Sequence, residues 1–165
     1  MNEPASNKEV CLRVATPDDI TVLAKHHRMM FEEIWEIKGI PTDPSGLASL
    51  EKEYAKKLTN EFKSGTCSSW VVQIGDQIVS SGAISIVVYV PVPHDLSPRI
   101  AFLHSIYTEK EYRHQHYARD ITQEAANYCR SQGIKRLYLF ASDAGRPLYE
   151  NIGFEPVPNM MMLHQ

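Results

Sequence analysis

The sequence lacks the long apolar runs that mark membrane proteins and secreted precursors. No stretch approaches the ~18 consecutive apolar residues of a membrane-spanning helix. The opening residues, MNEPASNKEV, lack the apolar centre of a secretory signal peptide. These absences predict a protein without a membrane span, and we expect residues 1–8 to form a short flexible tail.

The chain has few cysteines, and their spacing does not indicate a metal site. The three cysteines, Cys11, Cys67 and Cys129, are far apart in the chain, are odd in number and form no Cys-x-x-Cys pair. Such a pattern argues against a disulfide framework and is typical of reduced thiols in the cytosol. The sequence therefore predicts a cytoplasmic protein.

An excess of positive charge is also missing. The chain has 17 Lys and Arg against 20 Asp and Glu, which gives a net charge of −3. Short basic runs such as Lys56-Lys57 fit a solvated helix face, so the sequence has no electrostatic footprint for nucleic acid. With 165 residues, of which 43% are apolar, the chain is expected to form one globular domain over residues 1–165.

Hydrophobic periodicity predicts a mixture of strands and helices. The expected strands, rich in Val and Ile, cover residues 10–14, 69–74, 77–89, 100–107, 137–141 and, as a last antiparallel strand, 156–163. The expected helices cover residues 16–37, 47–62 and 118–132, with a short fourth helix before Gly153. The segment from 100 to 141 reads as a strand–helix–strand unit, and its first crossover is where α/β proteins bind phosphate-bearing cofactors.

Two stretches of this unit carry a family resemblance. One is the turn Arg113-His114-Gln115-His116-Tyr117-Ala118, and the other is Leu148-Tyr149-Glu150-Asn151-Ile152-Gly153-Phe154. They resemble the GNAT superfamily of acetyl-CoA-dependent N-acetyltransferases, with its Arg/Gln-x-x-Gly-x-Gly/Ala turn and its Leu-Tyr-Glu-x-x-Gly-Phe signature. The second stretch fits closely, whereas His114 and His116 stand where the family commonly has glycine.

The resemblance implies a fold and a co-substrate. The fold would be a GNAT-like, mostly antiparallel mixed sheet of about seven strands with a central parallel pair and about four helices. Strands 100–107 and 137–141 would splay apart near residues 105–107 and admit the pantetheine arm of acetyl-CoA. The residues then expected to bind acetyl-CoA are Ile106, Tyr107, Arg113, His114, Gln115, His116, Tyr117, Ala118, Arg119 and Ser142.

The resemblance also suggests catalytic residues. Tyr149 occupies the position of the tyrosine that protonates the CoA thiolate, and a phenol with a pKa near ~10 can donate at neutral pH; the alternative is a tyrosine that only packs at a helix end. His104 lies where the family often has a glutamate base; alternatively it only hydrogen-bonds across the sheet. Glu33 is a weaker candidate for the base, and a backbone amide near Ile106 is expected to stabilise the oxyanion.

Other polar and aromatic residues have simpler or additional roles. His114 and His116 have a metal-like spacing, but they fall in a turn without nearby cysteine or a carboxylate pattern, so no metal site is predicted. Phe31 and Trp35 share a helix face and are the candidates for an acceptor pocket. His27 falls on the apolar stripe of its helix and is interpreted as a hydrogen-bonded, partly buried side chain.

These observations favour an enzyme that transfers an acetyl group from acetyl-CoA to a primary amine of a small molecule or peptide. Attack would be direct, in a ternary complex, without a covalent nucleophile. The alternative is a non-catalytic module on the same fold that senses CoA or acyl-CoA or binds a protein partner. A third interpretation, a dimerisation domain, rests on exposed edge strands alone, and a homodimer is kept as an expectation.

Overall fold

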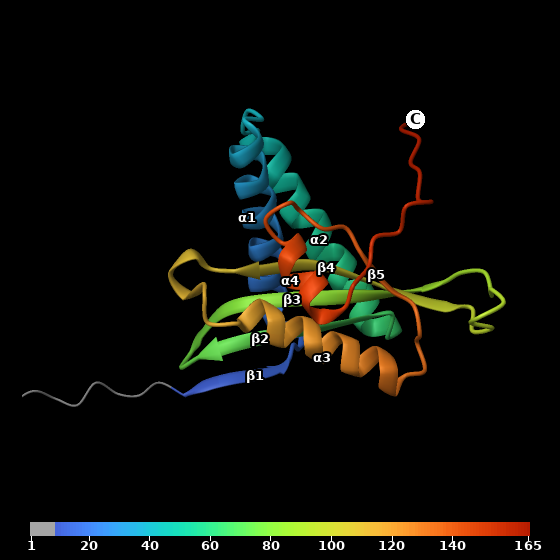
Figure 1. Cartoon of the computed structure of the whole chain (residues 1–165). Helices are drawn as coiled ribbons and strands as arrows, with labels where there is room; N and C mark the ends of the chain where they lie inside the picture. Colours follow the sequence, from blue (N-terminus) through green and yellow to red (C-terminus); the bar gives the residue numbers. More distant parts are fainter. Residues whose placement is uncertain (1–8) are drawn as a thin grey trace, which may run out of the picture.

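The computed structural model describes residues 9–165, and these form one five-stranded sheet flanked by helices (Figure 1). The strands follow the chain order across the sheet: β1 (Val10–Val14), β2 (Cys67–Ile74), β3 (Gln77–Val88), β4 (Arg99–Thr108) and β5 (Leu137–Leu139). The first four strands are antiparallel, whereas β4 and β5 are parallel, as predicted. The helical crossover between β4 and β5 is the connection that a parallel pair requires.

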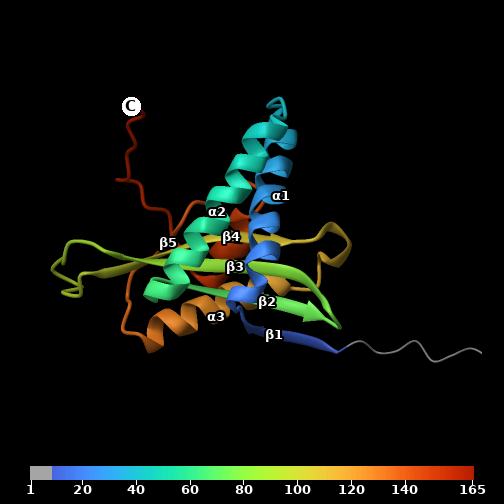
Figure 2. The same cartoon turned by 180° about the vertical axis from the view of Figure 1, so that it is seen from behind.

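Four α-helices in the described part of the chain cover the two faces of the sheet. They are α1 (Ile20–Lys38), α2 (Pro44–Ser64), α3 (Tyr117–Ser131) and α4 (Arg146–Ile152), and short 3₁₀ turns occur at η1 (Pro17–Asp19) and η2 (Lys110–Tyr112). Figure 2 shows α1 and α2 together on one face, with α3 on the opposite face. Gly65 ends α2 with φ of 71°, a left-handed conformation that glycine adopts without steric cost.

The sheet is buried on both faces because successive residues of a strand point in opposite directions. Val72 packs with Trp70 and Ile121 in the core under α3. Val71, its neighbour in β2, packs with Leu58 in the core under α1 and α2. The sheet is therefore a rigid central layer from which the polar groups of β4 can be positioned on the α1 and α2 side.

The C-terminal part of the sheet differs from the prediction. Five strands are found in residues 9–165 instead of about seven, and the expected strand at 156–163 is absent. Pro156 and Pro158 cannot donate a backbone hydrogen bond to a ladder, and Met161 is 94% exposed. As a result β5 is an edge strand of three half-buried residues, and its predicted central position is wrong.

Residues 9–165 contain no helix that is both long and apolar enough to cross a membrane. Within the same residues, no three His, Cys, Asp or Glu side chains gather in an arrangement that could hold a metal ion. The predicted flexible tail, residues 1–8, lies outside the described part of the chain.

Candidate active site

A cleft of about 1140 Å³ opens where β4 and β5 separate. The two strands pair only from Ala101 to Leu103 on β4, and β5 ends opposite Leu103. Beyond this point the cleft is lined by α1, the second half of β4, residues 112–119, the loop after β5 and α4. The separation begins at His104, close to the predicted position, and the cleft volume suits a large organic ligand.

A bulge in β4 turns the backbone at the mouth of this cleft. Ser81 pairs with Tyr107 and Ala83 pairs with His104, so Ser105 and Ile106 together face the single residue Gly82 of β3. Ser105 has φ of 58°, in the left-handed region. Such bulges re-aim side chains and break the regular ladder, which places Ser105 and Ile106 among the cleft residues.

The turn before α3 keeps a glycine-like backbone although it contains histidines. His114 and His116 have φ of 64° and 65°, and these are the two positions where the resembled family commonly has glycine. Their side chains are exposed, as is that of Gln115. His116 directly precedes α3, whose first-turn amides have no partner within the helix and carry a partial positive charge. This edge of the cleft can therefore bind a phosphate through its backbone.

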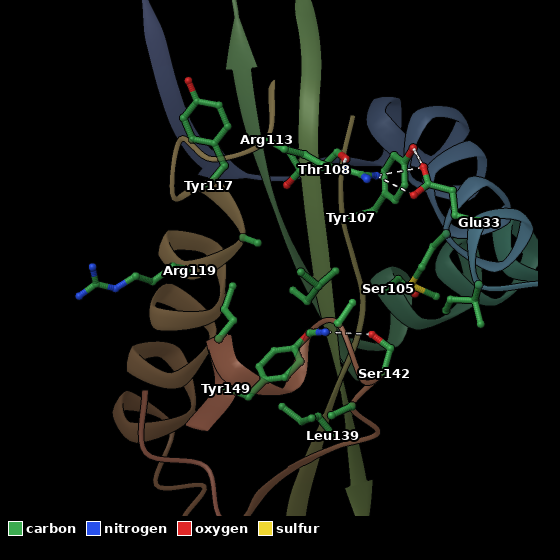
Figure 3. A pocket seen from close by; sticks show the side chains of 18 of the residues that line it. Glu33, Ser105, Tyr107, Thr108, Arg113, Tyr117, Arg119, Leu139, Ser142 and Tyr149 are labelled. Carbon is green, nitrogen blue, oxygen red and sulfur yellow. Dashed lines mark hydrogen bonds and ion pairs between the residues drawn. The ribbon is translucent and has the colours of Figure 1, made fainter. Parts of the chain in front are cut away.

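The side chain of Arg113 connects this turn to α1 and β4. Its Nη2 donates to both carboxylate oxygens of Glu33, at 2.9 and 2.8 Å, and its Nε donates to the Thr108 carbonyl at 2.9 Å. Tyr107 Oη also donates to Glu33, at 2.8 Å. Figure 3 shows the three side chains meeting beside the cleft. Glu33, the weaker candidate base, is thus already engaged by two donors.

Tyr149 lies in α4, and its ring lines the cleft opposite α1 (Figure 3). Burial raises the pKa of its hydroxyl to about 12, so the group is protonated at neutral pH. The ring packs edge-on against Phe154, with centroids 5.9 Å apart. Ser142, on the loop before α4, accepts a hydrogen bond from the Gly145 amide at 3.2 Å and also lines the cleft.

His104 is the centre of a polar group that we call the histidine cluster: His27, Tyr54, Ser85, His104 and Ser105. His104 Nδ1 lies 3.2 Å from Tyr54 Oη and 3.0 Å from Ser105 Oγ, and its Nε2 lies 2.9 Å from Ser85 Oγ. His27 Nδ1 lies 2.7 Å from Ser105 Oγ, and the His27 ring stacks on Tyr54 with centroids 3.9 Å apart. The predicted cross-sheet hydrogen bond of His104 and the hydrogen-bonded, partly buried state of His27 are both present.

Burial and nearby charge keep the histidine cluster uncharged. Burial, together with the positive charge of Lys57, lowers the pKa of His104 to about 3 and that of His27 to about 4. Burial also raises the pKa of Tyr54 above its ordinary value. At neutral pH both imidazoles therefore have one nitrogen with a free lone pair, which can accept a hydrogen bond or a proton.

The cleft also contains residues that the sequence did not single out. Of the two candidates for an acceptor pocket, Phe31 lines the cleft and Trp35 is not among its lining residues; Met30 and Ile34 of the same helix are. Ser105 was not foreseen as a site residue because its position depends on the bulge. The other expected acetyl-CoA-binding residues, from Ile106 and Tyr107 through residues 113–119 to Ser142, all line the cleft.

Comparison with known proteins agrees with this geometry. The sequence pattern of the acetyltransferase (GNAT) family matches residues 27–154, well over half of the chain. The chain belongs to the GNAT family. The match spans the histidine cluster, the turn before α3 and Tyr149, and it ends at Phe154. A search of curated protein sequences gave no match.

Solved structures show that the GNAT fold is shared over nearly the whole chain. A Clostridium acetobutylicum protein described as a predicted acetyltransferase, determined with acetyl-CoA, is 22% identical; it has a TM-score of 0.84 and covers 94% of this chain and 96% of its own. A GCN5-related N-acetyltransferase from Ralstonia eutropha JMP134 is 20% identical, with a TM-score of 0.83 and coverage of 94% and 99%. Arabidopsis thaliana glucosamine-6-phosphate N-acetyltransferase is 13% identical, with a TM-score of 0.66 and coverage of 95% and 99%.

Proposed function

We propose that this GNAT protein transfers the acetyl group of acetyl-CoA to a primary amine of a small molecule or peptide, by direct attack in a ternary complex. One observation carries the proposal: a single cleft brings together the unpaired amides of α3, a protonated tyrosine and a neutral histidine. Direct transfer requires an anion-binding edge, a proton donor and a proton acceptor. The acetyl-CoA in the similar Clostridium acetobutylicum structure supports the choice of co-substrate.

Residues 114–119 suit the pyrophosphate of acetyl-CoA. The positive φ angles of His114 and His116 keep the backbone open before the first turn of α3, and the exposed imidazoles leave the amides accessible. Arg119, also exposed, lines the same part of the cleft and adds a positive charge. Bound acetyl-CoA would supply the acetyl thioester, and the gap between β4 and β5 would hold its pantetheine arm.

Two side chains would handle the protons of the reaction. Tyr149 Oη, protonated at neutral pH, would donate to the departing thiolate. His104 would take up the proton that the attacking amine loses, because its ring is neutral and it lines the cleft beside Ser105. The backbone amide of Ile106, next to the bulge, would stabilise the developing oxyanion.

The competing proposal is a non-catalytic module that binds CoA or a protein partner. The two histidines at glycine positions favour it, because a left-handed conformation costs an L-residue about 1–2 kcal/mol. The intact Leu148–Phe154 stretch favours the enzyme, since it brings the Tyr149 hydroxyl, a proton donor that mere binding does not require, to the cleft. Phe31, with Met30 and Ile34, would then line the acceptor pocket.

Binding and turnover separate the two proposals. Acetyl-CoA at about 100 times its dissociation constant should add about 2.7 kcal/mol of stability, which is roughly 5–10 °C in melting temperature for a domain of this size. Free CoA release should then be measured with polyamines, amino acids, aminoglycosides and peptide N-termini. A thermal shift without CoA release from any amine supports the CoA-binding module. No shift at millimolar acetyl-CoA refutes both the enzyme and the CoA-binding module, and leaves only a module that binds a protein partner.

A further inference from the structure

A continuous chain of hydrogen-bonding groups runs from the cleft to two partly exposed side chains of α2, Lys57 and Glu61. It begins at Ser105, which lines the cleft, and continues through His104 to Ser85 of β3. Ser85 Oγ then donates to Glu61 Oε2 at 3.2 Å and accepts from Lys57 Nζ at 2.8 Å. Glu61 and Lys57 form an ion pair, and their side chains are 28% and 37% exposed, so the chain ends at solvent.

The donors and acceptors of this chain fix the tautomer of His104. Lys57 has only protons to give, so Ser85 accepts from it and uses its own proton toward the Glu61 carboxylate. Ser85 can then only accept from His104, which places a proton on Nε2. Nδ1 is therefore the bare nitrogen, and it faces the hydroxyl groups of Tyr54 and Ser105 on the cleft side.

We propose that Glu61 is the terminal proton acceptor of this enzyme, reached from the cleft through Ser105, His104 and Ser85. The inference rests on the proposed acetyl transfer and deepens it. In this proposal Ser85 and Glu61 act through His104 and do not touch the substrate. The polar groups that cross the interface between α2 and the sheet thereby gain a role in proton transfer.

The relay moves one proton without leaving a charge in the cluster. As the amine loses a proton to Ser105 Oγ, Ser105 passes its own hydroxyl proton to His104 Nδ1. His104 releases the proton on Nε2 to Ser85, and Ser85 passes its hydroxyl proton to Glu61. The carboxylate becomes a neutral acid that exchanges its proton with water. His104 ends as the other neutral tautomer and must exchange one ring proton before the next turnover.

This arrangement explains how a histidine with a strongly lowered pKa can serve in proton transfer. A base that must hold a positive charge works best with a pKa near the working pH, and burial together with Lys57 and His27 opposes that charge on His104. Tyr54 and Ser105 face Nδ1 of the ring, and Ser85 faces Nε2. Lys57 lies behind Ser85 and His27 lies behind Ser105, and each is hydrogen-bonded to that serine. In a relay the ring gains and loses a proton together, so the imidazolium is avoided.

Turnover of relay variants tests the proposal. The assay follows CoA release from acetyl-CoA with the amine that reacts fastest in the panel above. Ser85→Ala and Glu61→Gln should lower kcat by about 10²-fold or more, with the KM for acetyl-CoA unchanged. Ser85→Thr keeps a hydroxyl and should restore most of kcat. Ser69→Ala is the matched control, since Ser69 is a buried sheet serine that bonds only the Gly82 carbonyl and does not line the cleft.

The pH profile and the solvent isotope effect distinguish a relay from a structural role. Glu61→Gln removes the carboxylate at the end of the relay, so the kcat–pH profile of its residual activity should differ in shape from that of the wild type. The effect of D₂O on kcat should shrink in Ser85→Ala, because fewer protons move together. A structural role predicts instead a lower melting temperature with an unchanged pH profile, and that result overturns the relay.

The outcomes also separate this inference from the proposed function. An active wild type with equally active Ser85→Ala and Glu61→Gln variants overturns the relay alone. A wild type that binds acetyl-CoA but acetylates no amine overturns the proposed function and the relay with it. Nitrogen NMR of the His104 ring adds a readout without turnover: the relay requires the proton on Nε2, and a proton on Nδ1 in the resting protein refutes it.

Discussion

The two sides of the cleft use different parts of the chain. On the side of residues 113–119 the backbone would provide the groups that we propose bind acetyl-CoA, and the side chains of His114, Gln115 and His116 are exposed. On the side of the histidine cluster the polar groups belong to side chains. Every buried side-chain N or O atom in the described residues has a hydrogen-bond partner. A backbone site tolerates a change of residue when the φ angle is kept, whereas a hydrogen-bonded cluster depends on each side chain.

The largest expected effect comes from Tyr149 of α4, the proposed proton donor, which belongs to neither of these two sides. Tyr149→Phe removes one hydroxyl and keeps the ring against Phe154. If the hydroxyl is the general acid, kcat should fall by roughly 10²–10⁴-fold while acetyl-CoA affinity changes little. Tyr128→Phe is the control, because Tyr128 packs on Trp70 and does not line the cleft. Equal turnover in both variants would leave Tyr149 a packing residue.

The histidine cluster should make folding stability depend on pH. The folded pKa values of about 3 for His104 and about 4 for His27 lie below the unfolded value of ~6.5. Between the folded and the unfolded pKa values, the unfolded chain binds more protons than the folded protein does. The free energy of unfolding is therefore highest above pH ~6.5. Below that pH it falls by up to about 1.4 kcal/mol per histidine for each pH unit, until the folded pKa is reached. Urea unfolding of the wild type and of His27→Gln at pH 7, 6 and 5 should show a shallower decline in the variant. Parallel declines would mean that His27 is not held neutral.

The β4 bulge at Ser105 and Ile106 lies between the two sides of the cleft, and it depends on Gly82, the β3 residue that faces it. A Cβ atom there would lie 2.2 Å from Ile106 Cδ1 and 2.8 Å from Ile121 Cγ2. Gly82→Ala should therefore cost about 1–3 kcal/mol of unfolding free energy by overpacking. Adding Ile106→Val removes the nearer methyl group and should recover part of the loss in chemical denaturation. No recovery would place the strain at the fully buried Ile121 instead.

The smallest expected effect lies in the turn before α3. His116→Gly should relieve the left-handed strain of about 1–2 kcal/mol, offset by the ~0.5–1 kcal/mol entropy cost of glycine, for a net gain of up to about 1.5 kcal/mol. Acetyl-CoA affinity should be kept or improved, because the proposed phosphate contacts come from the backbone. Gln123→Gly, on the exposed face of α3, should lose about 1 kcal/mol. Loss of acetyl-CoA binding in His116→Gly would show that the imidazole itself is a ligand.

The residues on the two sides of the cleft could not be predicted equally well from the sequence. The family signature around Tyr149 and the turn at 113–118 are local patterns, so their positions on the cleft were foreseen. His104 was also foreseen, but Tyr54 and Ser85 were not, because they come from other elements and nothing in their local sequence marks them. The predicted strand at 156–163 is wrong for a local reason. Its apolar pattern is typical of a strand, but Pro156 and Pro158 cannot donate backbone hydrogen bonds to a sheet.

By itself the sequence determined the helices, the first four strands and the parallel pairing of β4 with β5, because periodicity, caps and a helical crossover are properties of short segments. Only the tertiary structure decided that β4 bulges at Ser105, that Arg113 turns to Glu33, and that His104 meets groups from α2 and β3. Those contacts join residues 19 to 80 positions apart. They form only when both faces of the sheet are packed, so no local pattern in the chain records them.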